Sequence, residues 1–173
     1  MAENPSAEEI AELQKKNCIF CKIISKEIPS TEIYSDKEVT VILDINPANE
    51  GHCIILPNQH YQILPQLPDR LIGIIAIVAK KISRTLLKSL AVKGTSIFIA
   101  NGAIAGQKSP HFMVHVIPRR NNDMLFSLPK NPGNEKQLEE IKAKLITRLS
   151  GNIKKPETSE IDFDKISNFF GQK

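Results

Sequence analysis

The run from Pro110 to Arg119 alternates so that it could place chemistry on one face of a strand. Successive side chains of a strand point to opposite faces, so His111, Met113 and His115 should share a face of imidazoles, and the residues between them should face the core. Imidazole can act as a nucleophile, a general base or a metal ligand. The thioether of Met113 cannot be activated by a neighbouring base and gives no stable phosphoryl intermediate. The chemistry of this strand therefore rests on its two histidines.

Two of the three cysteines, Cys18 and Cys21, form a C-x-x-C pair. Three cysteines are too few for a disulfide framework, and this spacing favours a metal site or a redox site. A thioredoxin-like redox pair follows a strand and opens a helix, whereas a helix-like segment precedes these cysteines. We therefore favour a metal site, with a pair of reduced core thiols as the alternative. Cys53 lies in an apolar run and is expected to be a small buried hydrophobic residue.

The chain has only four histidines, His52, His60, His111 and His115. Two thiolates and two imidazoles would give zinc the closed tetrahedral shell of a structural site. These residue types alone do not decide which two imidazoles complete the shell, and His60 could also be a surface loop residue. A site of this kind would join distant parts of the chain, so metal binding would be coupled to folding.

The strands that would position these side chains form an antiparallel pattern. Residues 33–43 are predicted to form a hairpin around Ser35-Asp36-Lys37, and further strands are expected over 53–56 and 95–100. The loop 101–107 leads into the histidine strand, and its two glycines allow the backbone to approach a ligand closely. The sequence therefore predicts an antiparallel sheet that ends in the histidine strand.

Three helices are predicted around this sheet. Ser6 and Glu9 form a capping box that begins a short N-terminal helix. Pro68 and Asp69 begin a long helix whose apolar residues widen beyond one face, which indicates a subunit interface or deep burial within one chain. Residues 135–149 carry apolar side chains at helical spacing.

Length and composition favour one domain with extensions. The chain has 173 residues, 41% of them hydrophobic, and a net charge of +4, which is too small to predict nucleic-acid binding. We expect an N-terminal helical extension over 1–16, one domain over 17–150, and a polar linker with a hydrophobic tail over 151–173. No run approaches the roughly 20 apolar residues that span a bilayer. The acidic start is unlike a signal peptide, so a cytoplasmic location without membrane contact is expected.

The order of several short motifs resembles the histidine triad (HIT) family. The matching motifs are Cys18-Ile-Phe-Cys-Lys-Ile-Ile, Glu27-Ile-Pro-Ser, Leu43-Asp-Ile-Asn-Pro, Gly51-His, Leu56-Pro, Asn101-Gly, Gly106-Gln and Pro110-His-Phe-Met-Val-His-Val-Ile-Pro-Arg. The resemblance covers about residues 17–120. It implies a HIT-like α+β fold, in which an antiparallel sheet carries a long central helix and a C-terminal helix, and a homodimer joined across the long helix and its neighbouring strand.

In the family signature, three histidines alternate with apolar residues, and Met113 stands at the middle histidine. The resemblance implies that the middle imidazole is the nucleophile that attacks a nucleotide's phosphate, so this chain lacks it. In family members with an N-terminal C-x-x-C pair, the resemblance implies a structural zinc site. Its ligands here would be Cys18, Cys21, His60 and His111.

The resemblance also implies a nucleotide pocket. The residues expected to pack against the base are Ile19, Phe20 and Ile23, and the residues expected around the α-phosphate are Asn101, Gln107 and His115. Asp44 would accept hydrogen bonds from the ribose hydroxyls, because a carboxylate accepts and does not donate. An apolar slot suits the face of a purine.

Structural interpretations of these residues stand beside the functional ones. Ile19, Phe20 and Ile23 could be core residues, and Asp44 could end a strand in a turn. His52 is more readily explained as a hydrogen-bonded buried imidazole than as a ligand contact. Lys108 adds positive charge beside the expected phosphate site, and Lys108 or Ser109 would replace the missing nucleophile only with an activating base within reach.

The leading hypothesis is a zinc-stabilised HIT protein that binds a purine nucleotide, such as AMP or GMP, with little or no hydrolase activity. A second hypothesis is a HIT nucleotide hydrolase or phosphoramidase that retains residual activity. A third is a non-catalytic interaction module that docks a protein or ribonucleoprotein through its C-terminal tail, which could equally fold back on its own subunit. The apolar residues of this tail are Ile161, Phe163, Ile166, Phe169 and Phe170.

Overall fold

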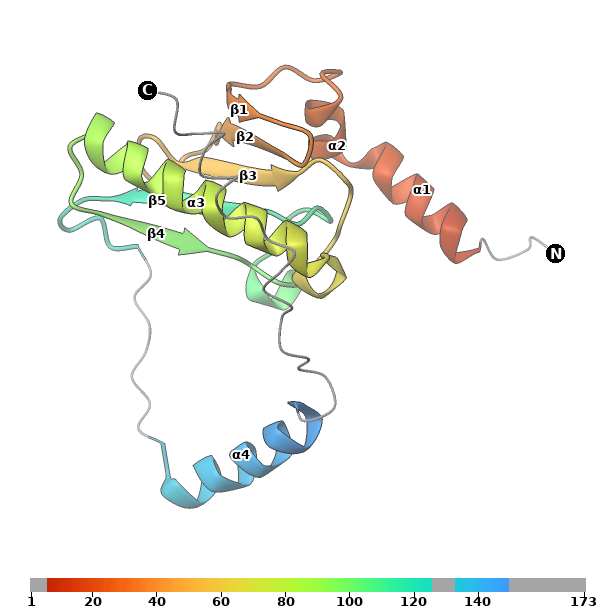
Figure 1. The fold of residues 1–173 in the computed structure, drawn as a ribbon, viewed down its shortest axis with the longest axis vertical. Coiled ribbons are helices and arrows are strands. Elements are labelled where there is room, and N and C mark those ends of the chain that lie inside the picture. The colour runs from red at the N-terminus through yellow and green to blue at the C-terminus, as the bar shows by residue number, and fades with distance from the viewer. Residues whose placement is uncertain (1–5, 126–132, 150–173) are drawn as a thin grey trace. The chain divides into compact units, whose positions relative to one another are not determined.

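The computed structural model describes residues 6–125 and 133–149 of the chain (Figure 1). The chain divides into two compact units, residues 1–123 and 124–173. Their boundary falls inside the domain of residues 17–150 that the sequence suggested, and the predicted linker and tail over 151–173 lie outside the described residues. Within the described ranges, no helix has both the length and the apolar character needed to cross a membrane.

Five strands form one sheet in the first unit, and all neighbouring strands are antiparallel, as predicted. Their order across the sheet is β1-β2-β3-β5-β4. The strands are β1 Glu32–Ser35, β2 Val39–Leu43, β3 Cys53–Pro57, β4 Gly94–Phe98 and β5 Val114–Arg119. β3 lies in the middle of this order and is buried along its whole length. The centre of the sheet is therefore covered on both of its faces.

The histidine strand begins later than the sequence predicts. β5 starts at Val114, so His111 and Met113 precede its ladder. The physical reason is a backbone hydrogen bond outside the sheet, in which the Phe112 N–H donates to the Tyr61 carbonyl at 2.6 Å. The alternation of faces continues through this segment, because Phe112 packs in one core cluster and Met113 against the other.

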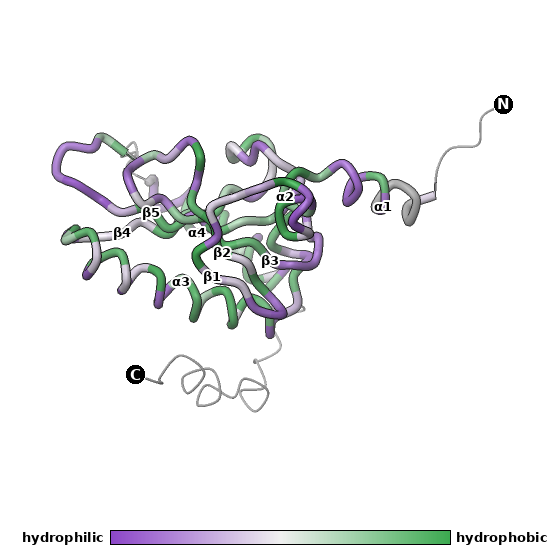
Figure 2. The backbone as a smooth tube through the Cα atoms, turned by 90° about the horizontal axis from the view of Figure 1, so that it is seen from above, coloured by the Kyte–Doolittle hydropathy of each residue, from purple (hydrophilic) through white to green (hydrophobic). Residues whose placement is uncertain are grey.

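One face of the sheet is covered by the long helix α3, Asp69–Ser89, as predicted (Figure 2). Its buried residues recur at the spacing of a single helix face. They are Leu71, Ile75, Val78, Ala79 and Leu86. They pack against inward side chains of β2, β3 and β5 to form the main core. Full burial of each large side chain contributes about 1.5–3 kcal/mol.

A short helix that the sequence did not predict, α2 Ile19–Ile24, packs on the opposite face of the sheet (Figure 2). The buried members of its cluster are Ile23, Ile42, Ile54 and Leu56, and Met113 packs against them. The histidine face of β5 is therefore not a face of imidazoles alone, because this second core cluster shares it. The predicted N-terminal helix is present as α1, Ala7–Asn17, directly before α2.

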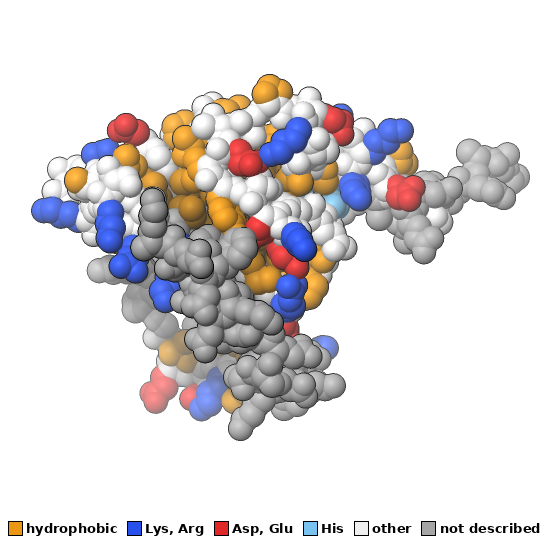
Figure 3. All heavy atoms as spheres, turned by 45° about the horizontal axis from the view of Figure 1, so that its top comes forward, with side chains coloured by type: hydrophobic (Ala, Val, Ile, Leu, Met, Phe, Trp, Pro, Cys, Tyr) orange, Lys and Arg blue, Asp and Glu red, His pale blue; other side chains and the backbone are white. Residues whose placement is uncertain are grey.

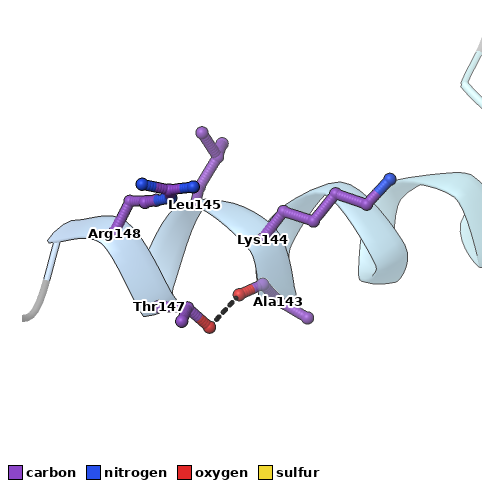
Figure 4. Close-up of a pocket in the computed structure, with 5 residues that line it drawn as sticks. All are labelled: Ala143, Lys144, Leu145, Thr147 and Arg148. Atoms are coloured by element: carbon purple, nitrogen blue, oxygen red, sulfur yellow. Dashed lines mark hydrogen bonds between the residues drawn. The ribbon is translucent and has the colours of Figure 1, made fainter.

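The described part of the second unit contains the helix α4, Glu135–Leu149, at the position predicted for the C-terminal helix. Its apolar side chains are about half exposed. A hollow of about 610 Å³ lies along this helix. Figure 4 shows the five residues that line it, and the Thr147 hydroxyl among them donates to the Ala143 carbonyl at 2.8 Å. The lining residues of this hollow all belong to α4 and include none of the candidate site residues.

Candidate functional site

Cys18, Cys21, His60 and His111 come together in the first unit, although up to 93 positions separate them in the sequence. Cys18 is the N-cap of α2 and Cys21 lies within this helix, while His60 follows β3 and His111 precedes β5. Their four ligand atoms all lie within 4.8 Å of one another. The fold thus gathers the four residues that the family resemblance implied as metal ligands.

The separations between these atoms fit a tetrahedral metal centre. The Cys21 sulfur lies 3.2 Å from Nδ1 of His60 and 3.6 Å from Nδ1 of His111, and the Cys18 sulfur lies 3.5 Å from Nδ1 of His111. Zinc with Zn–S bonds of about 2.3 Å and Zn–N bonds of about 2.0–2.1 Å has sulfur–nitrogen edges of about 3.5 Å. The donor set and its geometry therefore suit zinc.

His111 is oriented for this role by its other ring nitrogen. Nε2 of His111 donates to the Pro57 carbonyl at 3.0 Å, so Nδ1 faces the sulfurs as an acceptor. The ring is fully buried, and this burial lowers the pKa of His111 to about 4. The pKa of His60 is also lowered, first by burial and then by Lys15. Both rings are therefore neutral at pH 7, the form that binds a metal.

At pH 7 the surroundings of Cys21 favour its neutral thiol. Burial and then the neighbouring Cys18 raise the pKa of Cys21 to about 12. A bound divalent cation would instead deprotonate this thiol. Nε2 of His60 is buried, and it has no hydrogen-bond partner in the part of the chain that the structure describes. A metal would be bound by the other nitrogen, Nδ1, which faces the Cys21 sulfur, so the support for a metal comes from the paired thiols and the donor geometry and not from Nε2.

A second pair of imidazoles is formed by His52, which directly precedes β3, and His115 on β5. Nδ1 of His52 accepts a hydrogen bond from the Ala48 N–H at 3.2 Å, so the proton of His52 belongs on Nε2. Nε2 lies 2.9 Å from Nδ1 of His115 and donates to it. The proton of His115 is then on its own Nε2. A backbone group thus sets the tautomers of both rings and leaves His115 with one outward donor.

Asp44 completes this second cluster. Its Oδ1 accepts from the Asn46 N–H at 2.8 Å, which forms the turn that ends β2, and its Oδ2 lies 3.4 Å from Nδ1 of His52. Asp44 and His115 approach different ring nitrogens of His52, so the three residues form a chain rather than a shell around one ion. His52 is buried with partners at both nitrogens, which confirms its interpretation as a hydrogen-bonded imidazole.

This pair predicts a loss of stability in acid. Burial lowers the pKa of both His52 and His115, and their mutual proximity lowers that of His115 further. Below the ordinary imidazole pKa of about 6.5, the unfolded chain binds protons that the two native imidazoles do not bind. The free energy of unfolding that this pair contributes is therefore fully present above pH 6.5 and falls as the pH drops. In urea unfolding from pH 8 to 5, His52→Gln should reduce this slope by up to about 1.4 kcal/mol per pH unit.

The same comparison at pH 7.5–8.5 is the control, because both imidazoles are neutral there and the difference between the two proteins should be constant. Equal slopes for the parent and His52→Gln below pH 6.5 would contradict the neutral, buried pair.

The residues expected to pack against a base divide into different environments. Ile23 is 9% exposed and belongs to the core cluster under α2, whereas Ile19 is 51% exposed. Phe20 is partly buried, and its ring centroid lies 6.0 Å from that of His111. Ile23 therefore has the structural role that was the alternative, and Ile19 and Phe20 supply accessible apolar surface.

The two amides expected around a phosphate already bind the backbone. Oδ1 of Asn101 accepts from the Leu64 N–H at 3.0 Å. The Gln107 amide accepts from the Gly102 N–H at 2.8 Å and donates to the carbonyls of Gln62 at 2.7 Å and of Ser109 at 2.9 Å. Gln107 therefore braces its own loop. The role of Gln62 was not predicted, because nothing in the sequence pairs it with a residue 45 positions away.

Comparisons with known proteins agree with this fold. Residues 25–122 match the model of the HIT domain. An uncharacterized HIT-like protein of Methanocaldococcus jannaschii is 41% identical over 129 residues, which cover 72% of this chain and 98% of that protein. The adenosine 5'-monophosphoramidase HNT1 of Saccharomyces cerevisiae is 32% identical over 137 residues, covering 78% of this chain and 84% of that protein.

A solved structure is similar as well. A Zn-bound histidine triad family protein from Mycobacterium smegmatis superposes with a TM-score of 0.61 at 33% identity, covering 80% of this chain and 99% of that chain. The α+β architecture described above is thus the HIT fold, and the chain belongs to the HIT family. The matched residues 25–122 include His60 and His111 but begin after Cys18 and Cys21.

Proposed function

We propose that this HIT protein binds a purine mononucleotide such as AMP or GMP, is stabilised by zinc, and has little or no nucleotide hydrolase activity. The observation that carries the proposal is the thioether of Met113 between His111 and His115. Imidazole can take up a phosphoryl or nucleotidyl group and release it to water, whereas a thioether cannot. Met113 packs against the apolar cluster under α2, which holds it as a hydrophobic residue.

Loss of the nucleophile leaves groups that could bind the ground state. His115 has one outward donor nitrogen, and Lys108 is exposed in the neighbouring loop. Binding a nucleotide and accelerating its reaction are separate contributions, so the first can persist without the second. The name of the yeast monophosphoramidase supports an adenosine monophosphate as the ligand. Calorimetric titration with AMP tests this binding directly.

The zinc part of the proposal is supported by the tetrahedral spacing of Cys18, Cys21, His60 and His111 and by the Zn-bound relative from Mycobacterium smegmatis. Zinc would supply the positive charge that the two thiolates need and would tie α2 to the segments around His60 and His111. We also propose a cytoplasmic location, since a reducing compartment keeps such thiols available for a metal.

Slow hydrolysis by direct attack of water is the second candidate. It is favoured by the hydrogen-bonded pair of His52 and His115, because the outward Nε2–H of His115 could donate to a phosphate oxygen while a water molecule attacks the phosphorus. An assay with adenosine 5'-phosphoramidate separates the two functions. Turnover by the parent protein above the rate of the uncatalysed reaction would support the hydrolase, and its absence would support binding alone.

We further propose a homodimer formed along β4. This strand is an edge of the sheet, and Ile97 on it is 54% exposed. In sedimentation velocity the parent should behave as a dimer, and Ile97→Glu should weaken its association at least about 100-fold, since a charge would be buried without a partner. Ile104→Glu is the matched control, because Ile104 is fully exposed on a loop. A monomeric parent, or an unchanged Ile97→Glu dimer, would contradict this interface.

A further inference from the structure

The two cysteines of the metal cluster differ in their exposure. Cys18 is 2% exposed, whereas Cys21 is only partly buried. Cys21 lines a surface groove of about 830 Å³ between α1 and α2, together with Lys15, Lys16 and Lys22. Figure 3 shows basic side chains beside a small exposed patch of histidine at the base of the N-terminal helix. A small solute can therefore reach one sulfur of the pair and not the other.

The same two sulfurs are placed to join each other. They lie within 4.8 Å, and the cysteines are three positions apart at the start of α2. The distance between Cα atoms one helical turn apart, about 5 Å, lies within the range of about 4.4–6.8 Å that disulfides span. A disulfide between Cys18 and Cys21 would therefore need only local side-chain movement.

We propose that Cys18 and Cys21 are a hydroperoxide-sensitive thiol pair, in which Cys21 reacts first and Cys18 closes the disulfide. The Cys21 thiolate attacks one oxygen of the peroxide, the O–O bond breaks, and Cys21 sulfenic acid and hydroxide form. The Cys18 thiolate then attacks the Cys21 sulfur and expels a second hydroxide. Two electrons pass from the two sulfurs to the peroxide, which is the oxidant, and each hydroxide takes up a proton that one of the two thiols released on ionisation, so two water molecules form.

Disulfide formation would remove two of the four ligands, so His60 and His111 alone would hold zinc weakly and it would leave. Both the disulfide and this loss of zinc rest on the zinc site proposed above, because burial raises the pKa of the free Cys21 thiol to about 12 and a bound cation would be needed to keep it a thiolate at neutral pH. Loss of zinc would also affect the loop before β5, because the segment that begins at His60 is hydrogen-bonded to that loop. The Gln62 carbonyl accepts a hydrogen bond from the Gln107 side-chain amide at 2.7 Å, and the Gln62 side-chain amide donates to Gln14 of α1.

The test treats the purified protein with hydrogen peroxide and follows two readouts. Intact mass should fall by about 2 Da, which a dithiol should reverse, and peptide mapping should place the bond between Cys18 and Cys21. A chromogenic chelator should record about one zinc released per disulfide. A sulfenic-acid trap should label Cys21 before any other thiol. Cys53→Ser is the control and should behave as the parent, because Cys53 is 1% exposed and lies outside the cluster.

Unchanged thiols after a tenfold molar excess of peroxide, a first label on Cys18 or Cys53, or a bond between two chains would each overturn the proposal. A chain that carries no zinc before oxidation would contradict the zinc site instead. Zinc content measured before oxidation and the state of the thiols measured after it therefore separate a failure of the zinc site from a failure of the thiol pair.

Discussion

Replacing Cys18 by alanine should abolish the binding of zinc and lower the Tm by about 10–15 °C. For a structural site, the free energy of metal binding is also free energy of folding. Three ligands and an independent core would persist in the variant, so we expect the loss of about 4 kcal/mol rather than unfolding. Metal content by atomic emission and thermal unfolding by circular dichroism, both on protein purified without chelator, measure the two effects.

Cys53→Ala is the matched control for this experiment. Both Cys18 and Cys53 are buried, so both replacements remove one sulfur atom from the interior. Cys53 lies in the main core and outside the metal cluster, so its loss should cost only about 1–2 kcal/mol and leave the zinc bound. Equal Tm values for the two variants, neither containing metal, would show that the cluster is a set of packed thiols and imidazoles.

Replacing Met113 by histidine should create phosphoramidase activity. We expect the hydrolysis of adenosine 5'-phosphoramidate to rise about 10³-fold over the parent, which corresponds to about 4 kcal/mol of transition-state stabilisation. The reason is that the new imidazole would stand between His111 and His115, where the family resemblance implies the nucleophile. Steady-state release of ammonia or AMP measures the rate.

Met113→Leu controls for a change of side chain at this position. Leucine keeps an apolar side chain of similar volume against Ile23 and Ile54, so the variant should fold as the parent does and stay inactive. A folded Met113→His protein as inactive as its parent would show that the remaining site cannot support turnover. A parent that already hydrolyses the substrate as fast as the variant would show that Met113 does not limit catalysis.

The elements with strong local patterns could be predicted from the sequence. α3 follows from apolar residues at three- and four-residue spacing after Pro68 and Asp69, and it is present over Asp69–Ser89. The helix α2 could not be predicted, because it has only six residues, of which three are β-branched isoleucines. Packing of Ile23 on the sheet stabilises it, and that packing depends on strands far along the chain.

The candidate site also could be predicted only in part from the sequence. The types and spacing of Cys18 and Cys21 indicated a metal site, and the family resemblance supplied His60 and His111, which the fold brings into the same cluster. The contacts of Gln107 were not predictable in the same way. Its amide could bind either a phosphate or the backbone, and only the folded position of Gln62 decides that it braces the loop.

Calorimetric titration of AMP, with GMP alongside, into metal-loaded protein tests whether a nucleotide pocket persists in this protein without its nucleophile. We expect saturable binding with a dissociation constant in the micromolar range, which corresponds to a binding free energy of about 7–8 kcal/mol, without release of product. No heat up to millimolar nucleotide would contradict the persistence of this pocket.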